Sequence, residues 1–206
     1  MSVDAGVRAS WFAWTIRFEG LVLHLYRDVR GLATVGLGCL VESAEASVAL
    51  PWHLASGAFA GVGDVRDDWA RVMAMPPGLA ASAYGDPDGL YLPVDAVDAL
   101  ALARLDADVA ELERHLGPLD ALPTQAQQVA ASIAWACGAD WPATWPHLVA
   151  AYRARDWAAA VAPEVPARAH PDGRPVLVCD LDERGNPGLR ARNAANDALL
   201  LELAWG

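Results

Sequence analysis

The sequence predicts a mainly α fold that carries one small β element near its N-terminus. Apolar residues recur at helical spacing across residues 97–116, for example at Val97, Leu105 and Leu116. Residues 21–41 differ, because two short β-rich runs flank a turn-prone break at Asp28–Gly31. These two observations indicate an α+β fold of the mainly α kind.

The first elements are a helix and a β-hairpin. Aromatic and apolar residues of Ala9–Leu21 favour one side of a helix, and Gly20 weakens its end. In the β-rich stretch that follows, Gly36 and Gly38 alternate with apolar residues. This pattern suggests a bent strand whose backbone approaches another part of the protein closely. A further helix is expected at Val41–Leu54.

Two segments are predicted to be additions to one domain that spans residues 1–206. The first, at about 56–92, holds six glycines and three prolines. It is expected to be an irregular insertion with one short helix around Asp67–Met75. The second, at about 163–185, is polar and rich in Pro and Gly, with a possible small hairpin around Val176–Val178.

The remaining elements are helices. The periodic stretch Val97–Leu116 ends at a Gly-Pro pair. Thr124 and Gln127 have the spacing of a capping box, which predicts a helix that opens there and runs through Cys137 with Gly138 as its C-cap. Shorter helices are expected at Thr144–Arg153 and Asp156–Ala162, and a final one at Gly188–Ala204 after the N-cap-like pair Asn186-Pro187.

Composition argues against several classes of partner. The net charge of −11 disfavours nucleic acid, whose phosphates demand a basic face. Charges interrupt every apolar run before it reaches the length of a membrane span. The histidines and cysteines form neither HExxH nor CxxC. We therefore expect no nucleic acid, no membrane span, no metal and no cofactor.

The N-terminus and the cysteines indicate where the chain is made. Met1–Ser10 lacks the basic start and apolar run of a secretory signal. Cys39, Cys137 and Cys179 are odd in number and widely spaced, which disfavours a disulfide framework. We therefore expect synthesis in the cytoplasm without a signal peptide.

Two carboxyl groups near the N-terminus lie in contrasting contexts. Glu19 ends an aromatic-rich helix and precedes apolar residues, whereas Asp28 lies in a turn between two arginines. Hydrolysis of a glycosidic bond needs one carboxyl group that donates a proton and another that acts from the opposite face. Burial among apolar groups suits a proton donor, and we expect it for Glu19. Spacing alone leaves open that Glu19 caps or pairs locally and that Asp28 is only a turn residue.

The run FEGLVLHLYRDVRGLATVGLGCLV resembles the catalytic segment of the phage-type lysozymes, glycoside hydrolase family 24. That segment has Glu-Gly, eight residues between Glu and Asp, five between Asp and Thr, and then Gly-x-Gly. The matching residues are Glu19, Gly20, Asp28, Thr34, Gly36 and Gly38. The resemblance extends more weakly to the helix at Thr124–Gly138 and to the C-terminal NPGLRARNAANDALL, and covers about half of the chain.

The resemblance implies a lysozyme-like fold, in which a small β-hairpin lobe packs beside a helical lobe with a cleft between them. It also implies a muramidase, which cuts the β-1,4 bond between N-acetylmuramic acid and N-acetylglucosamine, usually with inversion. Glu19 would be the general acid that protonates the leaving oxygen. Asp28 would help to hold and activate a water molecule, and Thr34 would position it.

Further site residues are implied by the same resemblance. Trp135 matches a cleft aromatic residue, Leu40 an apolar contact after the Gly-x-Gly pair, and Arg192 a basic residue near the acid. Each residue has a structural alternative. For Trp135 the alternative is a core residue on the buried side of an amphipathic helix. The sequence departs from the family at Cys39, where His is common, and at Ala136, where Asn or Gln is common.

Peptidoglycan glycan strands are the partner that the resemblance implies, with action in the periplasm or outside the cell after release or secretion. A phage endolysin and a secreted antibacterial effector remain open. An effector would need an immunity protein, for which 56–92 offers a surface. Two other functions also remain: a lytic transglycosylase, which Asp28 and Thr34 argue against, and a non-catalytic module that binds glycan or a protein.

Overall fold

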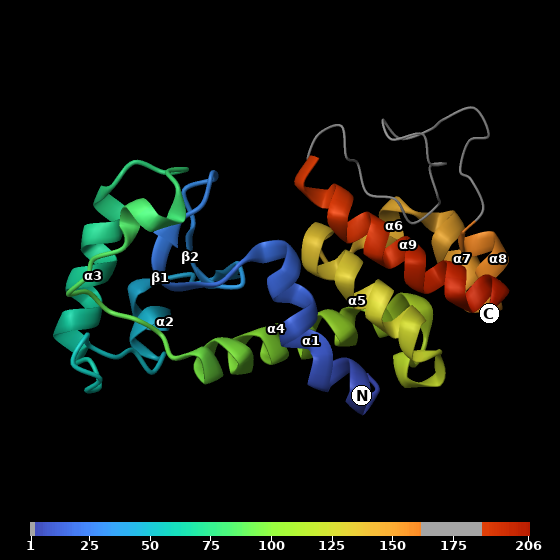
Figure 1. The fold of residues 1–206 in the computed structure, drawn as a ribbon, viewed down its shortest axis with the longest axis horizontal. Helices are drawn as coiled ribbons and strands as arrows, with labels where there is room; N and C mark the ends of the chain where they lie inside the picture. Colours follow the sequence, from blue (N-terminus) through green and yellow to red (C-terminus); the bar gives the residue numbers. More distant parts are fainter. Residues whose placement is uncertain (1–2, 162–186) are drawn as a thin grey trace. The chain divides into compact units, whose positions relative to one another are not determined.

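The computed structural model describes residues 3–161 and 187–206 (Figure 1). Helices hold 63% of these residues, and three short strands form an antiparallel sheet. The prediction of a mainly α fold with a small β element is therefore confirmed. The chain divides into two compact units. The helical unit comprises Met1–Trp11 and Leu105–Gly206, and the hairpin unit comprises Phe12–Arg104.

The hairpin unit contains the sheet, with strands in the order β1 (Val22–Arg27), β2 (Ala33–Gly36) and β3 (Cys39–Leu40). All four residues of β2 are buried, as befits the middle strand. The sequence predicted two β runs, and the second run divides into two strands. It divides because Gly36 and Gly38 adopt φ angles of 69° and 85°, which glycine tolerates and which allow the chain to reverse.

The register of the sheet aligns one row of side chains across all three strands. Tyr26 on β1 pairs with Thr34 on β2, and Thr34 pairs with Leu40 on β3. Directly paired residues point to the same face of a sheet. Tyr26, Thr34 and Leu40 therefore share a face.

The glycines of β2 and the following turn were expected to mark a close backbone approach, and Gly36 confirms this. A Cβ atom at Gly36 would lie 2.6 Å from Cγ1 of Val97, on α4 (Val94–Leu116). Real Cβ atoms do not come that close to another carbon, so glycine lets the end of β2 pack directly on this helix.

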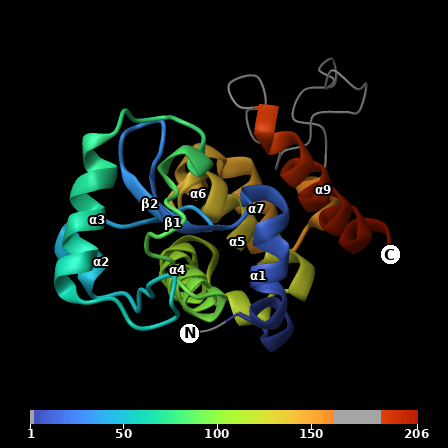
Figure 2. The same cartoon turned by 60° about the vertical axis from the view of Figure 1, so that its left-hand side comes forward.

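Two helices and a 3₁₀ turn cover this side of the hairpin unit, and one helix and the turn pack directly on β1. They are α2 (Ala44–Val48), α3 (Val62–Ala74) and η1 (Ala81–Tyr84). Helix α3 packs on both α2 and β1, and η1 also packs on β1 (Figure 2). The segment 56–92, expected to be irregular, therefore contributes a full helix and the main cover of the first strand.

Two predicted helices in this unit have the wrong length. The helix expected at Val41–Leu54 is only α2, which begins after Ser43, whose Oγ accepts a hydrogen bond from Ala46 N at 3.1 Å. It stops early because Pro51 disfavours helical backbone in the residue before it. Helix α3 starts five residues earlier than the expected Asp67. Gly61 N donates to the Asp64 carboxylate at 2.8 Å and so stabilises that start.

In the helical unit, α5 (Thr124–Cys137) is buried along most of its length, from Ala126 to Trp135. Most of these buried residues are apolar, as suits an interior helix, and the buried polar ones include Gln127 and Ser132. Helix α9 (Arg190–Trp205) packs along it, preceded by the 3₁₀ turn η3 (Pro187–Leu189). The other elements are η2 (Leu119–Ala121), α6 (Trp141–Thr144), α7 (Pro146–Ala154) and α8 (Trp157–Ala160).

The ends of α5 confirm one prediction and correct another. Gly138 has φ 96° and donates its N–H to Ala134 O at 2.8 Å, as expected of the C-cap. The capping box predicted from Thr124 and Gln127 is wrong, because no side chain caps the N-terminus of α5. Instead, Gln127 Oε1 accepts a hydrogen bond from Asp4 N at 2.6 Å, and its Nε2 donates to Leu122 O at 2.8 Å. The first bond joins α5 to the N-terminal segment, and the second joins it to the loop that precedes the helix.

Helix α1 (Ala5–Glu19) and α4 each contribute residues to both units. None of the helices in the described part of the chain combines the length and the apolar character that a membrane span requires. The extra segment predicted at 163–185 and the N-cap expected at Asn186 lie outside the described residues.

Candidate active site

Glu19 is the last residue of α1, and its side chain is exposed. The helix ends there because Gly20 has φ 73° and its N–H donates to Ile16 O at 3.1 Å. The burial expected for Glu19 is therefore wrong: the apolar residues that follow it enter β1 and do not cover it. Its Oε2 lies 3.9 Å from the position of a Cβ at Gly38, which places the carboxyl group beside the turn between β2 and β3.

Asp28 begins the turn between β1 and β2, and the backbone of this turn fixes its carboxylate. Oδ1 accepts hydrogen bonds from Arg30 N at 2.9 Å and Leu32 N at 2.8 Å. The main chain of Asp28 also bonds within the turn, with its N–H on Leu32 O and its carbonyl oxygen receiving Gly31 N, both at 3.0 Å. The carboxylate thus has a defined orientation although it lies in a loop.

Thr34 lies in the middle strand, only 6% exposed. Its Oγ1 donates to Leu32 O at 3.3 Å, so the hydroxyl group is oriented by the same turn that holds Asp28. The hydroxyl oxygen retains lone pairs that can accept a further hydrogen bond.

Tyr26 is a neighbouring residue that the sequence reasoning missed. It pairs with Thr34 across the hairpin, and burial raises the pKa of its phenol. The negative charges of Glu19 and Asp28 raise this pKa further, and Cys39 adds a smaller effect of the same sign. Both carboxylates are thus within electrostatic reach of one side chain. The predicted hairpin turn could have indicated Tyr26, because it places that residue opposite the start of β2.

Glu19, Asp28 and Thr34 all belong to the hairpin unit, and so does Leu40. Leu40 is 52% exposed and directly neighbours Thr34 in the sheet. Its exposure on the row of Tyr26 and Thr34 is compatible with the apolar contact expected of it.

Trp135 and Arg192 belong to the helical unit and are both buried there. Trp135 is 4% exposed and packs edge to face on Trp11, with ring centroids 5.7 Å apart. Arg192 Nη1 donates to the carbonyl and hydroxyl oxygens of Ser132, each at 3.3 Å. These contacts support the structural alternatives for both residues, namely core packing for Trp135 and a tie between α9 and α5 for Arg192.

The two departures from the family lie in ordinary structural surroundings. Cys39 is buried on β3, paired with Val35 of β2. Ala136 is partly buried near the end of α5. Among residues 3–161 and 187–206, no three His, Cys, Asp or Glu side chains are grouped so that they could hold a metal ion.

Comparison of the sequence with protein-family models and with curated proteins finds no match. The resemblance of the segment from Phe18 to Val41 to the phage-type lysozymes therefore stays a prediction from the sequence.

Proposed function

We propose that this protein is a peptidoglycan hydrolase of the muramidase type, which cleaves the β-1,4 bond between N-acetylmuramic acid and N-acetylglucosamine in a lysozyme-like fold. One observation carries the proposal. The hairpin unit holds an exposed carboxyl group at a helix end beside the β2–β3 turn, a carboxylate fixed in the β1–β2 turn, and a threonine hydroxyl oriented by that same turn.

Glu19 is proposed as the general acid. Its exposed carboxyl group can reach the oxygen of a bound glycan. In the proposed complex, the bound sugar covers the carboxyl group of Glu19 and excludes water from it.

Asp28 is proposed as the base, with Thr34 as the second contact to the attacking water. Oδ1 of Asp28 is engaged by two backbone amides, while its Oδ2 receives no hydrogen bond from the described residues. A carboxylate with one oxygen fixed and one oxygen open suits a group that must accept a proton from water in a set direction.

In the proposed step, Glu19 gives its proton to the leaving glycosidic oxygen as the bond to the anomeric carbon breaks. A water molecule attacks the anomeric carbon from the opposite face and passes its proton to Asp28. The products are a new reducing end and a free hydroxyl group, and the configuration at the anomeric carbon is inverted. Proton transfer between the two carboxyl groups through water restores the enzyme, and the reaction uses no cofactor.

The test is digestion of purified sacculi, followed by mass spectrometry of the soluble products. Wild type should release muropeptides with reducing N-acetylmuramic acid ends, and Glu19→Gln should release none. Glu42→Gln is the matched control, because it makes the same change at another exposed glutamate of the hairpin unit. Sacculi left intact by the wild type would refute the proposal. Sacculi that are bound but not cut would instead identify a non-catalytic glycan-binding module.

The proposed site of action is the cell wall, reached after synthesis in the cytoplasm. Release as a phage endolysin and delivery as an antibacterial effector both place this chemistry on peptidoglycan. The net charge of −11 gives the protein no electrostatic attraction to an anionic cell wall. This lack of attraction favours delivery directly to the wall.

A further inference from the structure

The end of β1 is tied to the C-terminus of α3 by one side chain. Arg27 Nη1 donates to Met73 O at 3.0 Å and to Met75 O at 2.6 Å. The last carbonyl groups of a helix lack partners within the helix and carry partial negative charge, so a guanidinium group is well suited to them. Arg27 Nε also donates to Gly31 O at 3.2 Å. A single guanidinium group therefore bridges α3 and the turn that holds Asp28.

A second contact joins the same turn to the chain after α3. Gly78 N donates to the carbonyl oxygen of Asp28 at 3.1 Å. The backbone at Gly78 lies against Val29, whose Cα is 3.5 Å from the position of a Cβ at Gly78. The segment 56–92 therefore contacts the turn of Asp28 twice, through the Arg27 bridge and directly at Gly78.

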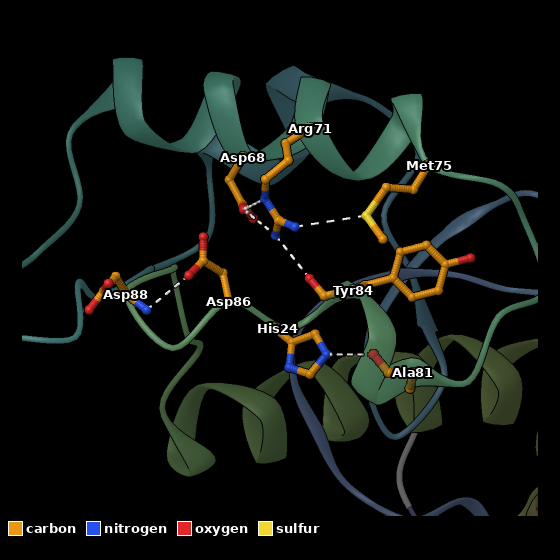
Figure 3. A network of polar contacts seen from close by, with 8 residues as sticks. All are labelled: His24, Asp68, Arg71, Met75, Ala81, Tyr84, Asp86 and Asp88. Carbon is orange, nitrogen blue, oxygen red and sulfur yellow. Dashed lines mark hydrogen bonds and ion pairs between the residues drawn. The ribbon is translucent and has the colours of Figure 1, made fainter.

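A polar network holds this part of the segment in place (Figure 3). Arg71 donates twice to the buried carboxylate of Asp68, at 2.7 and 3.0 Å, and once to Tyr84 O at 3.0 Å. The Tyr84 hydroxyl group donates to Pro76 O at 2.6 Å and accepts Leu79 N at 3.3 Å. This network joins α3 to η1 and to the loop between them. It therefore fixes the position of the carbonyl groups that Arg27 binds.

We propose that Arg27 is a positioning residue: it anchors the turn of Asp28 to α3 and so sets the direction of the Asp28 carboxylate. Through this contact, the segment 56–92 holds the turn of Asp28 in position. This inference deepens the proposed function and rests on it for the role of Asp28, but the anchoring itself is a property of the fold.

The geometry requires arginine. The three acceptors lie on two separate elements, and the planar guanidinium group reaches them from two of its nitrogens. Lysine keeps the positive charge near the end of α3 but presents a single nitrogen, so it cannot bridge the helix and the turn in the same way. Glutamine removes the charge and most of the donors.

The first arm of the test measures amide hydrogen exchange, which needs no substrate. In Arg27→Gln, the amides of Arg30 and Leu32, which donate to Asp28 Oδ1, should exchange about tenfold faster or more. In Arg27→Lys, the exchange rates of these two amides should lie between those of Arg27→Gln and those of the wild type. Arg66→Gln, an equal loss of charge at an exposed position of α3, should match the wild type. Turn amides that stay as in wild type in Arg27→Gln, or amides that accelerate equally throughout the hairpin unit, would overturn the proposal.

The second arm measures turnover of solubilised glycan strands. Arg27→Gln should lower kcat about tenfold with KM unchanged, because a displaced base reduces the rate of the chemical step and not binding. Arg27→Lys should recover part of kcat. A raised KM with unchanged kcat would overturn positioning and make Arg27 a substrate contact. An inactive wild type would refute the proposed function alone, and the exchange arm would still decide whether Arg27 anchors the turn.

Discussion

Replacement of Gly36 with alanine tests the packing that sets the end of β2. Gly36 has φ 69°, and its added Cβ would lie 2.6 Å from Cγ1 of Val97, a side chain that is 0% exposed. The left-handed backbone costs alanine about 1–2 kcal/mol. The clash in a filled interior adds about 1–3 kcal/mol, so the hairpin unit should lose roughly 2–5 kcal/mol of unfolding free energy.

Two comparisons separate the clash from the backbone effect. Gly57→Ala is the matched control, because Gly57 has φ 86° but no atom within 4 Å of the position of a Cβ. It should lose only about 1–2 kcal/mol. Val97→Ala removes the clashing methyl groups, so the double variant Gly36→Ala with Val97→Ala should be less destabilised than the sum of the singles by about 1–3 kcal/mol.

The assay is urea unfolding combined with amide exchange of β1 and β2, which reports the hairpin unit itself. Equal losses for Gly36→Ala and Gly57→Ala would refute the reasoning. Strictly additive effects in the double variant would refute it as well, because they would show that the added methyl group does not meet Val97.

Two further predictions concern Tyr26 and Arg192. Because burial and the charges of Glu19 and Asp28 raise the pKa of Tyr26 above 10.0, its contribution to stability is complete below pH 10 and is lost as the pH rises through the folded-state value. Ultraviolet titration of wild type against Tyr26→Phe should find this raised pKa, and Glu19→Gln should lower it; no change in that variant would contradict the proximity of Glu19. Arg192→Gln should destabilise the helical unit by about 1.5–3 kcal/mol, because buried charge-assisted hydrogen bonds to Ser132 are lost. Faster exchange of the α5 and α9 amides would support this, whereas unchanged exchange with a raised KM would favour a substrate contact.

Much of the helical framework could be predicted because its signals are local. The apolar periodicity of α4 and the Gly-Pro pair after it are visible within a short window, and α4 ends at Leu116 as expected. Gly138 likewise marks the end of α5. The turn at Asp28 follows from its own residues, since Asp and Gly favour it, and the backbone hydrogen bonds to Asp28 are those of such a turn.

The rest depends on partners that are distant in the sequence. Arg27 binds Met73 O, 46 residues away, and no local pattern indicates that contact. The exposure of Glu19 depends on the direction that the chain takes after Gly20, which the apolar character of the neighbouring residues does not reveal. Gln127 had the spacing of a capping box, but a tertiary bond to Asp4 N uses its oxygen instead. In each case tertiary structure overrides the local preference.

The most direct test of the account is digestion of sacculi in ¹⁸O-labelled water. Hydrolysis by a water molecule held at Asp28 predicts one ¹⁸O atom on the new reducing end of N-acetylmuramic acid in the wild-type products. It also predicts a fall in this product of roughly a hundredfold or more in Asp28→Asn, since general base catalysis contributes on this scale. Products that end in unlabelled 1,6-anhydro sugars, or an unchanged rate in Asp28→Asn, would contradict it.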